Sequence, residues 1–343
     1  MEPVGKPNLP SPEHESKMKP PGHRILVCLD RSPFSEMCVP YAVLLAKAFG
    51  SQLTLAYVLQ PRHEQANDAL GWEILMQEAR RYLERVQKRV SEALGQTVDI
   101  RLEQGRPAER IVALARETGA DLTVLGSRGE SGAPAKKLGS TVLEVLAEAR
   151  SSLFIVHPSS ITQTVAAPNR ILVPLDGSVR TESVLPAVAH LAGAHGAEVL
   201  LVHVVQEPLA SALLSAAEDM DLARTLAERI ETSAKKYLEL LRQQLAREVS
   251  SVRALVVRHG NAQQCLLEIS RKERSDLIVL SAHGSACDSS LSFGSVTAYL
   301  LTHSAVPVLV LQDLAARELH RALDDDAPLA PPSPRASYAA EKA

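Results

Sequence analysis

The 343-residue sequence predicts an α/β protein built of two tandem doubly wound domains. Short apolar runs that are typical of buried strands alternate along the chain with amphipathic segments typical of helices. Such alternation implies right-handed strand–helix–strand crossovers, and therefore a mostly parallel sheet with helices on both faces. The whole pattern then occurs a second time, which predicts two copies of one fold.

The first copy is expected to begin with a buried strand at 23–30, which ends in the carboxylate of Asp30. Ser32 fits an N-cap and Pro33 a first helical position, so we expect a helix from 33 to about 49. The remaining strands of this copy are expected at 53–59, 97–103, 121–125 and 152–156. The remaining helices are expected at 72–94, 105–118 and 141–149.

The second copy repeats the first at a nearly constant spacing. Residues 169–178 match 23–32 at a distance of 146 positions, and the next strand keeps that distance. From 258 onward the distance is 155, so nine extra residues fall in the second helix of the second copy, at about 215–247. The last strand is expected at 307–311. Self-similarity of this kind indicates a tandem duplication.

The repeat and the polar, proline-rich stretches set the expected domain boundaries. We expect a disordered tail at 1–22, a first domain at 23–158, a linker at 159–168, a second domain at 169–313, and a short helix followed by a disordered tail within 314–343. Segments rich in proline and charge leave too little apolar surface to bury, which is why the tails are expected to be disordered.

Composition bounds the class of protein. The net charge of −3 and the pI near 6.4 do not mark a nucleic-acid binder. No apolar run approaches the roughly 18 residues that span a bilayer, and the polar start is not a signal peptide. The four cysteines (28, 38, 265 and 287) form no CxxC pair, so a reduced, cytoplasmic setting is the simplest account. We therefore expect neither a nucleic-acid nor a membrane partner.

The most informative stretch of the first copy is the glycine loop at 126–142, GSRGESGAPAKKLGSTV, between a predicted strand and a predicted helix. Gly126 and Gly129 are three apart, and Gly139-Ser140 follows at the helix start. Glycine lets backbone N–H groups approach an anion closely, and the first N–H groups of a helix point at it with the favourable end of the dipole. The loop therefore suits a phosphate.

A second loop of this kind follows the fourth strand of the second copy. It reads Ser281-Ala-His-Gly284, nine residues, and then Gly294-Ser295, again between a strand and a helix. Either loop alone could be a plain turn, but two occurrences in matching context favour phosphate binding. His283 is either an exposed loop residue or a ligand contact, with no preference from the sequence.

Asp30 and Asp176 end the first strand of each copy. In an open parallel sheet, ligands bind beyond the carboxyl ends of the strands, where the strand order reverses. A carboxylate is a poor neighbour for phosphate but accepts hydrogen bonds from an adenine or a ribose. The combination with the glycine loop therefore favours a nucleotide, with the base near the Asp. The alternative is that each Asp merely caps the helix after its strand.

An Asp at the end of the first strand together with G-x2-G-x9-G-[S/T] resembles the universal stress protein family, over about 23–157 and 170–312. The resemblance implies a five-stranded parallel sheet of order 3-2-1-4-5 in each copy and binding of ATP, with any Mg²⁺ held by the phosphates rather than by protein side chains. It also implies that the last strands, 153–156 and 308–311, pair the two copies as a pseudo-twofold dimer, and it allows a homodimer of whole chains.

The resemblance also assigns site residues. In the first copy it implies Asp30 and Val58 at the adenine, Cys28 and Gly126 near the ribose, and Gly129, Gly139, Ser140 and Thr141 at the phosphates. In the second copy the matching positions are Pro174, Asp176, Val204, Ser281, Gly284, Gly294, Ser295 and Val296. The sequence departs from the family at Cys28, where a proline is usual, and at Ser281, where the first glycine is usual.

The charges near the two loops predict unequal sites. The first loop carries three cations, namely Arg128, Lys136 and Lys137. The second loop has only His283 as a possible cation and also carries Asp288. Because charge-assisted contacts to a triphosphate are strong, we expect the first site to bind ATP more tightly than the second.

Three functions fit these features. The favoured one is a stress-response regulator that binds ATP or another adenine nucleotide without turning it over, and the sequence assigns no catalytic residue. The second is a slow ATPase or nucleotide hydrolase, but no G-x4-GK[ST], HExxH or GxSxG motif supports it. The third is a nucleotide-free interaction module, against which the intact first loop argues.

Overall fold

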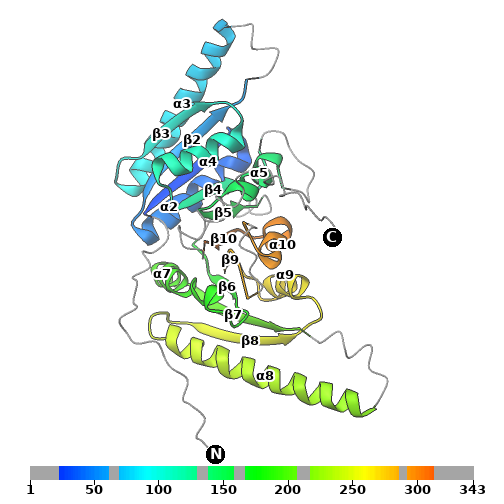
Figure 1. The fold of residues 1–343 in the computed structure, drawn as a ribbon. Coiled ribbons are helices and arrows are strands. Elements are labelled where there is room, and N and C mark those ends of the chain that lie inside the picture. Colours follow the sequence, from blue (N-terminus) through cyan, green and yellow to red (C-terminus); the bar gives the residue numbers. More distant parts are fainter. Residues whose placement is uncertain are drawn as a thin grey trace, which may run out of the picture.

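The computed structural model describes residues 23–61, 69–129, 138–157, 167–206, 217–285 and 292–312. Ten strands form one continuous sheet of order β3-β2-β1-β4-β5-β10-β9-β6-β7-β8 (Figure 1). Each half of the sheet has the order 3-2-1-4-5, so the predicted fold class is confirmed. The predicted tails and most of the predicted linker lie outside the described residues.

The strands follow the two copies of the sequence pattern. The first half holds β1 (Arg24–Leu29), β2 (Gln52–Leu59), β3 (Asp99–Gln104), β4 (Leu122–Gly126) and β5 (Ser152–Val156). The second half holds β6 (Arg170–Pro174), β7 (Glu198–Val205), β8 (Val252–Arg258), β9 (Leu277–Ser281) and β10 (Val308–Leu311). Within each half the strands pair in parallel, and the central strands are buried on both faces.

Five helices accompany each set of strands in the described part of the chain. The first half has α1 (Pro33–Glu36), α2 (Cys38–Phe49), α3 (Ala69–Leu94), α4 (Pro107–Thr118) and α5 (Ser140–Glu148). The second half has α6 (Val179–Glu182), α7 (Leu185–His195), α8 (Ala217–Leu245), α9 (Ala262–Lys272) and α10 (Ser295–His303). None of these described helices combines the length and apolarity needed to cross a membrane.

The single helix predicted from 33 to about 49 is wrong, because the chain breaks at Met37 into α1 and α2. The cause is Pro40, which has no backbone N–H to donate to the carbonyl of Glu36 and so interrupts the helical ladder. Pro186 stands at the matching position of the second half, where α6 and α7 are likewise separate. The predicted N-cap at Ser32 is confirmed, since its side chain accepts from the backbone N–H of Ser35.

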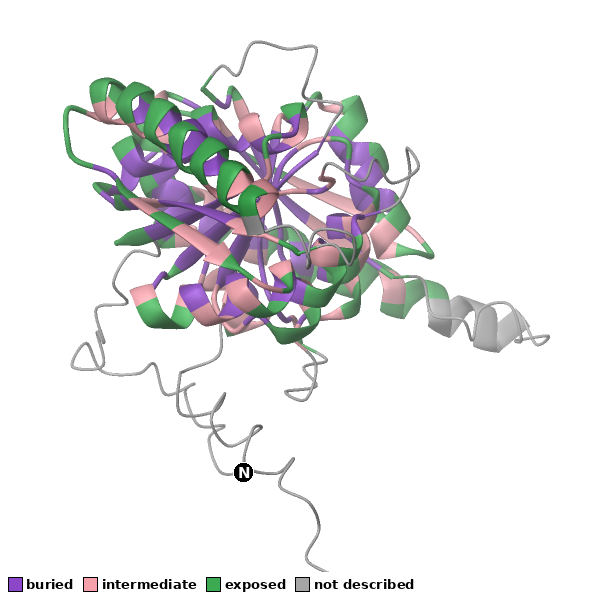
Figure 2. Ribbon diagram, turned by 90° about the horizontal axis from the view of Figure 1, so that it is seen from above, coloured by how far each residue is buried: buried purple, intermediate pink, exposed green. Residues whose placement is uncertain are grey.

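The core lies in two apolar layers, one on each face of the sheet. One layer packs α2, α3, α7 and α8 through residues such as Leu45, Leu83, Leu191 and Leu238. The other packs α4, α5, α9 and α10. Viewed from above, the buried strands run through the centre and the exposed residues lie mainly on the outer faces of the helices (Figure 2). Each layer spans both halves, so the halves share one core.

The two halves join at a strand pair and a helix pair. β5 and β10 are antiparallel, with Val308 opposite Ile155 and Val310 opposite Leu153. These are the strands for which the family resemblance implied pairing. On one face of the sheet α2 contacts α7, where the rings of Phe49 and His190 stack with centroids 5.9 Å apart.

Candidate functional site

The turn after β1 is organised by the carboxylate of Asp30. The backbone N–H and the hydroxyl of Ser32 both donate to Asp30 Oδ1, at 2.9 and 2.5 Å. Ser32 Oγ in turn accepts from the backbone N–H of Ser35 and so caps α1. Asp30 therefore orders the turn through Ser32, whereas the side chain that caps α1 is that of Ser32 and not, as the alternative interpretation had it, that of Asp30.

The turn after β6 repeats this arrangement with one more donor. Asp176 Oδ1 accepts from the backbone N–H of Ser178 at 3.0 Å, from its hydroxyl at 2.6 Å and from the Thr181 hydroxyl at 3.0 Å. The two turns differ in the residue after the Asp. Arg31 has a φ of 67° and Gly177 a φ of 88°, so the first half places an arginine in the left-handed region that glycine adopts freely.

Each carboxylate also meets the glycine loop of its own half. β1 pairs with β4, and β6 with β9, so the Asp and the loop lie at the same edge of the sheet. A Cβ added at Gly129 would lie 2.3 Å from Asp30 Oδ2, and one at Gly284 would lie 2.5 Å from Asp176 Oδ2. Only glycine allows this approach, which explains the second glycine of both loops.

In the second half this approach is a hydrogen bond. The backbone N–H of Ser285 donates to Asp176 Oδ2 at 2.6 Å, so one carboxylate holds both the turn and the loop. Partial burial favours the neutral acid, but the hydrogen bonds from Ser178, Ser285 and Thr181 stabilise the carboxylate more and lower its pKa to about 2. Asp176 is thus ionised at neutral pH, and its Oδ2, which accepts one hydrogen bond where Oδ1 accepts three, retains a lone pair for a further donor.

The helices after the loops begin with glycine and have no side-chain cap. Gly139 and Gly294 are the N-caps of α5 and α10, and neither helix receives a side-chain cap hydrogen bond. By contrast, Ser32, Ser178 and Asn261 cap their helices with side-chain oxygens. The first N–H groups of α5 and α10, which carry the positive end of the helix dipole, therefore face the loop without such a partner.

Packing does not explain these N-cap glycines. Their φ values, −65° and −68°, are open to any residue. An added Cβ would come no closer than 3.7 Å to its neighbours at Gly139 and 3.6 Å at Gly294, which is ordinary contact. A side chain would therefore fit at both positions, and what glycine adds there is the absence of a Cβ beside the first N–H groups of the helix, which makes them easier for an anion to approach.

The first residue of the loop differs between the halves. A Cβ at Gly126 would lie 3.0 Å from the carbonyl oxygen of Arg128 and 3.2 Å from that of Phe34. Ser281 occupies this position in the second half, and its hydroxyl donates to the carbonyl of His283 at 2.6 Å. The departure from the family pattern is thus accommodated by the loop backbone, and the serine hydroxyl points at the protein.

The other predicted residues line the same edge of the sheet. Cys28 and Pro174 are buried at the ends of β1 and β6, and burial raises the pKa of the Cys28 thiol. The remaining predicted positions are half-buried or exposed at the ends of β2 and β7 and the starts of α5 and α10: Val58, Val204, Ser140, Ser295, Thr141 and Val296. Four residues of the loop predictions lie outside the described residues: Lys136, Lys137, Cys287 and Asp288.

Two histidines were not foreseen in their observed settings. His283 is only 1% exposed, so its interpretation as an exposed loop residue was wrong. His157, directly after β5, was missed altogether. It is buried, and its Nε2 has no hydrogen-bond partner within the described ranges. Burial, and then the charge of nearby Arg128, lower its pKa to about 4. His157 follows β5 and Arg128 follows β4, so only the pairing of these two strands brings His157 and Arg128 together. No local sequence pattern could therefore predict their interaction.

Protein side chains offer no metal site in the described ranges, since no three His, Cys, Asp or Glu gather closely enough to hold an ion. A cavity of about 300 Å³ lies in the first half at the opposite end of β4, away from the glycine loop. The two carboxyl edges, each with an Asp and a glycine loop, are therefore the candidate functional sites.

This architecture defines a tandem, doubly wound α/β protein with a glycine loop at the carboxyl edge of each half. The model of the universal stress protein family matches residues 22–157 and again 168–312, and the chain belongs to this family. A single-domain universal stress protein of Thermus aquaticus is 34% identical over 137 residues, which cover 39% of this chain and 97% of the relative. The universal stress protein Slr1230 of Synechocystis sp. is 24% identical over 318 residues, covering 84% of this chain and 99% of the relative.

Solved structures agree on the fold. A universal stress protein from Archaeoglobus fulgidus superposes with a TM-score of 0.62 at 18% identity, covering 85% of this chain and 99% of that one. A protein described as a universal stress protein from Pseudomonas aeruginosa gives a TM-score of 0.58 at 15% identity. These structures match nearly along their whole length, so the tandem arrangement is also theirs.

Proposed function

We propose that each half of the protein binds an adenine nucleotide, that the first site prefers ATP, and that the protein acts as a nucleotide-responsive regulator of a stress response. The observation that carries this proposal is the pair of N-cap glycines, Gly139 and Gly294. Neither backbone angle nor packing requires glycine there, yet glycine begins both helices, and neither helix has a side-chain cap. An approaching phosphate supplies the missing reason.

The rest of the nucleotide would extend from the phosphate toward the strand ends. Asp30 and Asp176 stand between the loop and the turn and would accept a hydrogen bond from the adenine or the ribose. Val58 and Val204, half-buried at the ends of β2 and β7, would border the base. Any Mg²⁺ would be held by the phosphate oxygens, which are the kind of ligand that it prefers. The bound nucleotide would place its charged triphosphate against the loop. The loop would then differ between the nucleotide-bound and the nucleotide-free protein, and this difference would be the signal.

Regulation rather than turnover is favoured by the state of the groups next to the loop. Asp176 is held as a carboxylate by four hydrogen bonds, and His283 is buried. The low pKa of Asp176 makes it a weak general base, and His283 is shielded from solvent, so neither group is suited to activate a water molecule. A steady-state hydrolysis rate near about 10 per second, the median for enzymes, would overturn this part of the proposal.

The two domains are proposed to span 23–158 and 169–313 and to act as an intramolecular pseudo-dimer in a reduced, cytoplasmic setting. The antiparallel pairing of β5 with β10 and the contact of α2 with α7 support the pseudo-dimer. The buried free thiols Cys28, Cys38 and Cys265 support the setting.

The decisive first experiment is identification of the nucleotide that co-purifies with the protein, by mass spectrometry after denaturation. The second is a calorimetric titration with ATP of two double variants, Asp30→Ala with Gly139→Val and Asp176→Ala with Gly294→Val. We expect the first pair to remove the tighter binding. If no nucleotide is carried and wild-type protein binds no ATP, the proposal fails. If the second pair removes the tighter binding, the ranking of the sites is wrong.

A further inference from the structure

An arginine from outside the glycine loop lies near the phosphate end of the site proposed for the first half. Arg106 is the N-cap residue of α4, which packs beside α5 (Figure 1). Its Nη2 lies 3.7 Å from Glu144 Oε2 of α5. Ser140, which begins α5, is four positions before Glu144, so the two residues lie on the same face of that helix. Arg106 therefore contacts the face of α5 that carries Ser140.

The second half shows how close the starts of these two helices are. Gln263, in the first turn of α9, donates from Nε2 to the backbone carbonyl of Ser295 at 3.2 Å. Ser295 begins α10 and is the counterpart of Ser140 at a distance of 155 positions. A long side chain from the start of the preceding helix thus reaches the residue that begins the helix after the glycine loop. Arg106 comes from the matching turn of the first half, and its side chain is longer than that of glutamine.

The two halves differ at the N-cap of this preceding helix. Asn261 stands at the matching position of the second half, and its side chain caps α9 by accepting from the backbone N–H of Gln264 at 3.1 Å. A guanidinium accepts no hydrogen bond, and α4 has no side-chain cap. The first half thus lacks a stabilising cap at this position and has a positive charge in its place.

The partners of Arg106 leave its charge accessible to a ligand. Its side chain is 66% exposed, and it pairs with two exposed carboxylates, Glu109 at 2.7 Å and Glu144 at 3.7 Å. Exposed ion pairs of this kind are weak, so they compete poorly with a more highly charged partner. A triphosphate is such a partner, because arginine makes charge-assisted and often two-pronged hydrogen bonds to phosphate oxygens.

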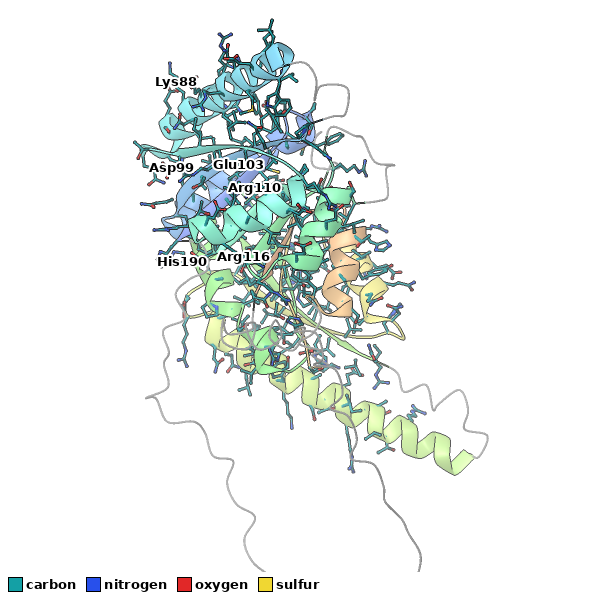
Figure 3. The ribbon with its side chains drawn as sticks, turned by 45° about the horizontal axis from the view of Figure 1, so that its top comes forward. Lys88, Asp99, Glu103, Arg110, Arg116 and His190 are labelled. Carbon is teal, nitrogen blue, oxygen red and sulfur yellow. The ribbon has the colours of Figure 1, made fainter. Side chains whose placement is uncertain are left out.

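The next arginine of α4 is engaged elsewhere. Arg110, one turn after Arg106, donates to Glu103 of β3 at 2.8 Å, and the two labelled residues lie close together in Figure 3. Both of these side chains are less exposed than that of Arg106. Arg110 therefore ties α4 to the sheet, whereas Arg106 is the one that contacts α5.

We propose that Arg106 pairs with the phosphate chain of the nucleotide at the first site and makes this site prefer ATP over AMP. The inference rests on the proposed function, since it adds a residue to the phosphate end of that site. The backbone N–H groups at the start of α5 serve any phosphate, but the attraction of a full positive charge grows with the charge of the phosphate chain. The second site, with Asn261 at this position, lacks this source of preference.

The test uses the full chain with Asp176→Ala and Gly294→Val, so that calorimetry reports on the first site. Arg106→Asn installs the residue of the second half together with its capping oxygen, and a thermal melt checks that the variant is folded. ATP affinity should fall by at least about tenfold and AMP affinity by less than about threefold. Arg116→Gln is the matched control, because it removes an exposed arginine, labelled in Figure 3, from the last turn of α4.

A conservative variant separates charge from shape. Arg106→Lys keeps the positive charge and should lose less ATP affinity than Arg106→Asn. The inference is wrong if Arg106→Asn binds ATP as tightly as its parent chain, if ATP and AMP lose equal affinity, or if Arg116→Gln loses as much as Arg106→Asn. Any of these results leaves the proposed function intact as long as ATP binds. Wild-type protein that binds neither nucleotide overturns the proposed function and this inference with it.

Discussion

The two carboxyl edges of the sheet share one backbone design and differ in the side chains around it. Both have an Asp against the second glycine of the loop, a serine-capped turn, and a glycine N-cap without a side-chain partner. Among the matched positions where they differ are Gly126 against Ser281, Arg31 against Gly177, and His157 against Gln312. The shared features are those that position backbone N–H groups, which indicates that backbone donors define the site and side chains adjust its strength.

The largest effect is expected where the two sites agree. Gly129→Val and Gly284→Val would each force a side chain into a carboxylate 2.3 or 2.5 Å from the new Cβ, so the loop must move away from its Asp. Each variant should lower nucleotide affinity at its own site by more than about tenfold, measured by ATP calorimetry. Gly260→Ala, whose Cβ would meet nothing within 4 Å, is the matched control. Unchanged affinity in both valine variants would mean that the loops do not hold the nucleotide.

The next effect concerns a matched position where the halves differ, His157 against Gln312. The pKa of His157 falls from 6.5 in the unfolded chain to about 4 in the folded protein, so the unfolded chain binds the proton first on acidification. Wild-type stability therefore falls between pH 6.5 and pH 4. At about pH 5, His157→Gln should recover about 2 kcal/mol relative to its effect at about pH 8.

Urea unfolding at both pH values measures this difference. His23→Gln, which changes an exposed histidine at the start of β1, is the control for the loss of a titratable group. If His157→Gln loses stability on acidification as steeply as wild type, then His157 is not the group that destabilises the folded protein.

Asp176 gives an acid-dependent effect of smaller size. Its pKa falls from 3.8 to about 2 on folding, so it stabilises the folded protein above pH 3.8, and this contribution is lost as the pH falls toward 2. Because Asp176 is only partly buried and solvent screens its charge, we expect Asp176→Asn to cost only about 1 kcal/mol at neutral pH. The cost should shrink as the pH falls toward 2, as followed by chemical denaturation. If the loss of folding stability in Asp176→Asn does not depend on pH, the amide destabilises the protein for steric reasons and not through the missing charge.

The smallest effect tests the turn itself. Arg31 occupies the left-handed region at a φ of 67°, where its matched partner is Gly177. Arg31→Gly should stabilise the protein by about 0.5 kcal/mol, since relief of backbone strain exceeds the added freedom of the unfolded chain. Gly177→Arg should destabilise it by about 1 kcal/mol. Arg31→Gly also removes the exposed ion pair between Arg31 and Glu78. Glu78→Gln removes the same ion pair without changing the turn, so it measures what the pair contributes to stability. Equal thermal stability of all variants would show that the turn is not strained.

Local patterns were sufficient to predict the strands, the repeat and the meeting of Asp30 with the glycine loop. The hydrophobic periodicity and the length of an apolar run identify a strand. Neighbouring parallel strands place the residues that follow them at the same edge of the sheet. The break at Met37 was not predicted, because Ser32 and Pro33 indicate only where a helix begins. The sequence signal for the break was Pro40, because proline has no backbone N–H with which to continue the helical hydrogen bonds.

Other features depend on distant parts of the chain. The environment of His157 arises only when β5 pairs with β4 and Arg128 comes close. The cavity lined by Ile111 and Val145 arises from the packing of α4 against α5. The continuous sheet of ten strands requires the antiparallel pairing of β5 with β10. The residues of these two strands do not indicate which strand each one pairs with. Volume and pairing across the fold are not encoded in any short window.

The β5–β10 pairing has a consequence for how the protein can evolve. If two separate copies met through these strands, dilution would dissociate them, and every substitution would appear on both sides of the twofold axis. Within one chain the pairing is unimolecular, with an effective concentration set by the short connection between β5 and β6. The chain therefore fixes a one-to-one stoichiometry of two non-identical partners. A position can therefore hold different residues in the two halves, as Arg150 and Ala305 show, and every molecule contains one half of each kind at any protein concentration.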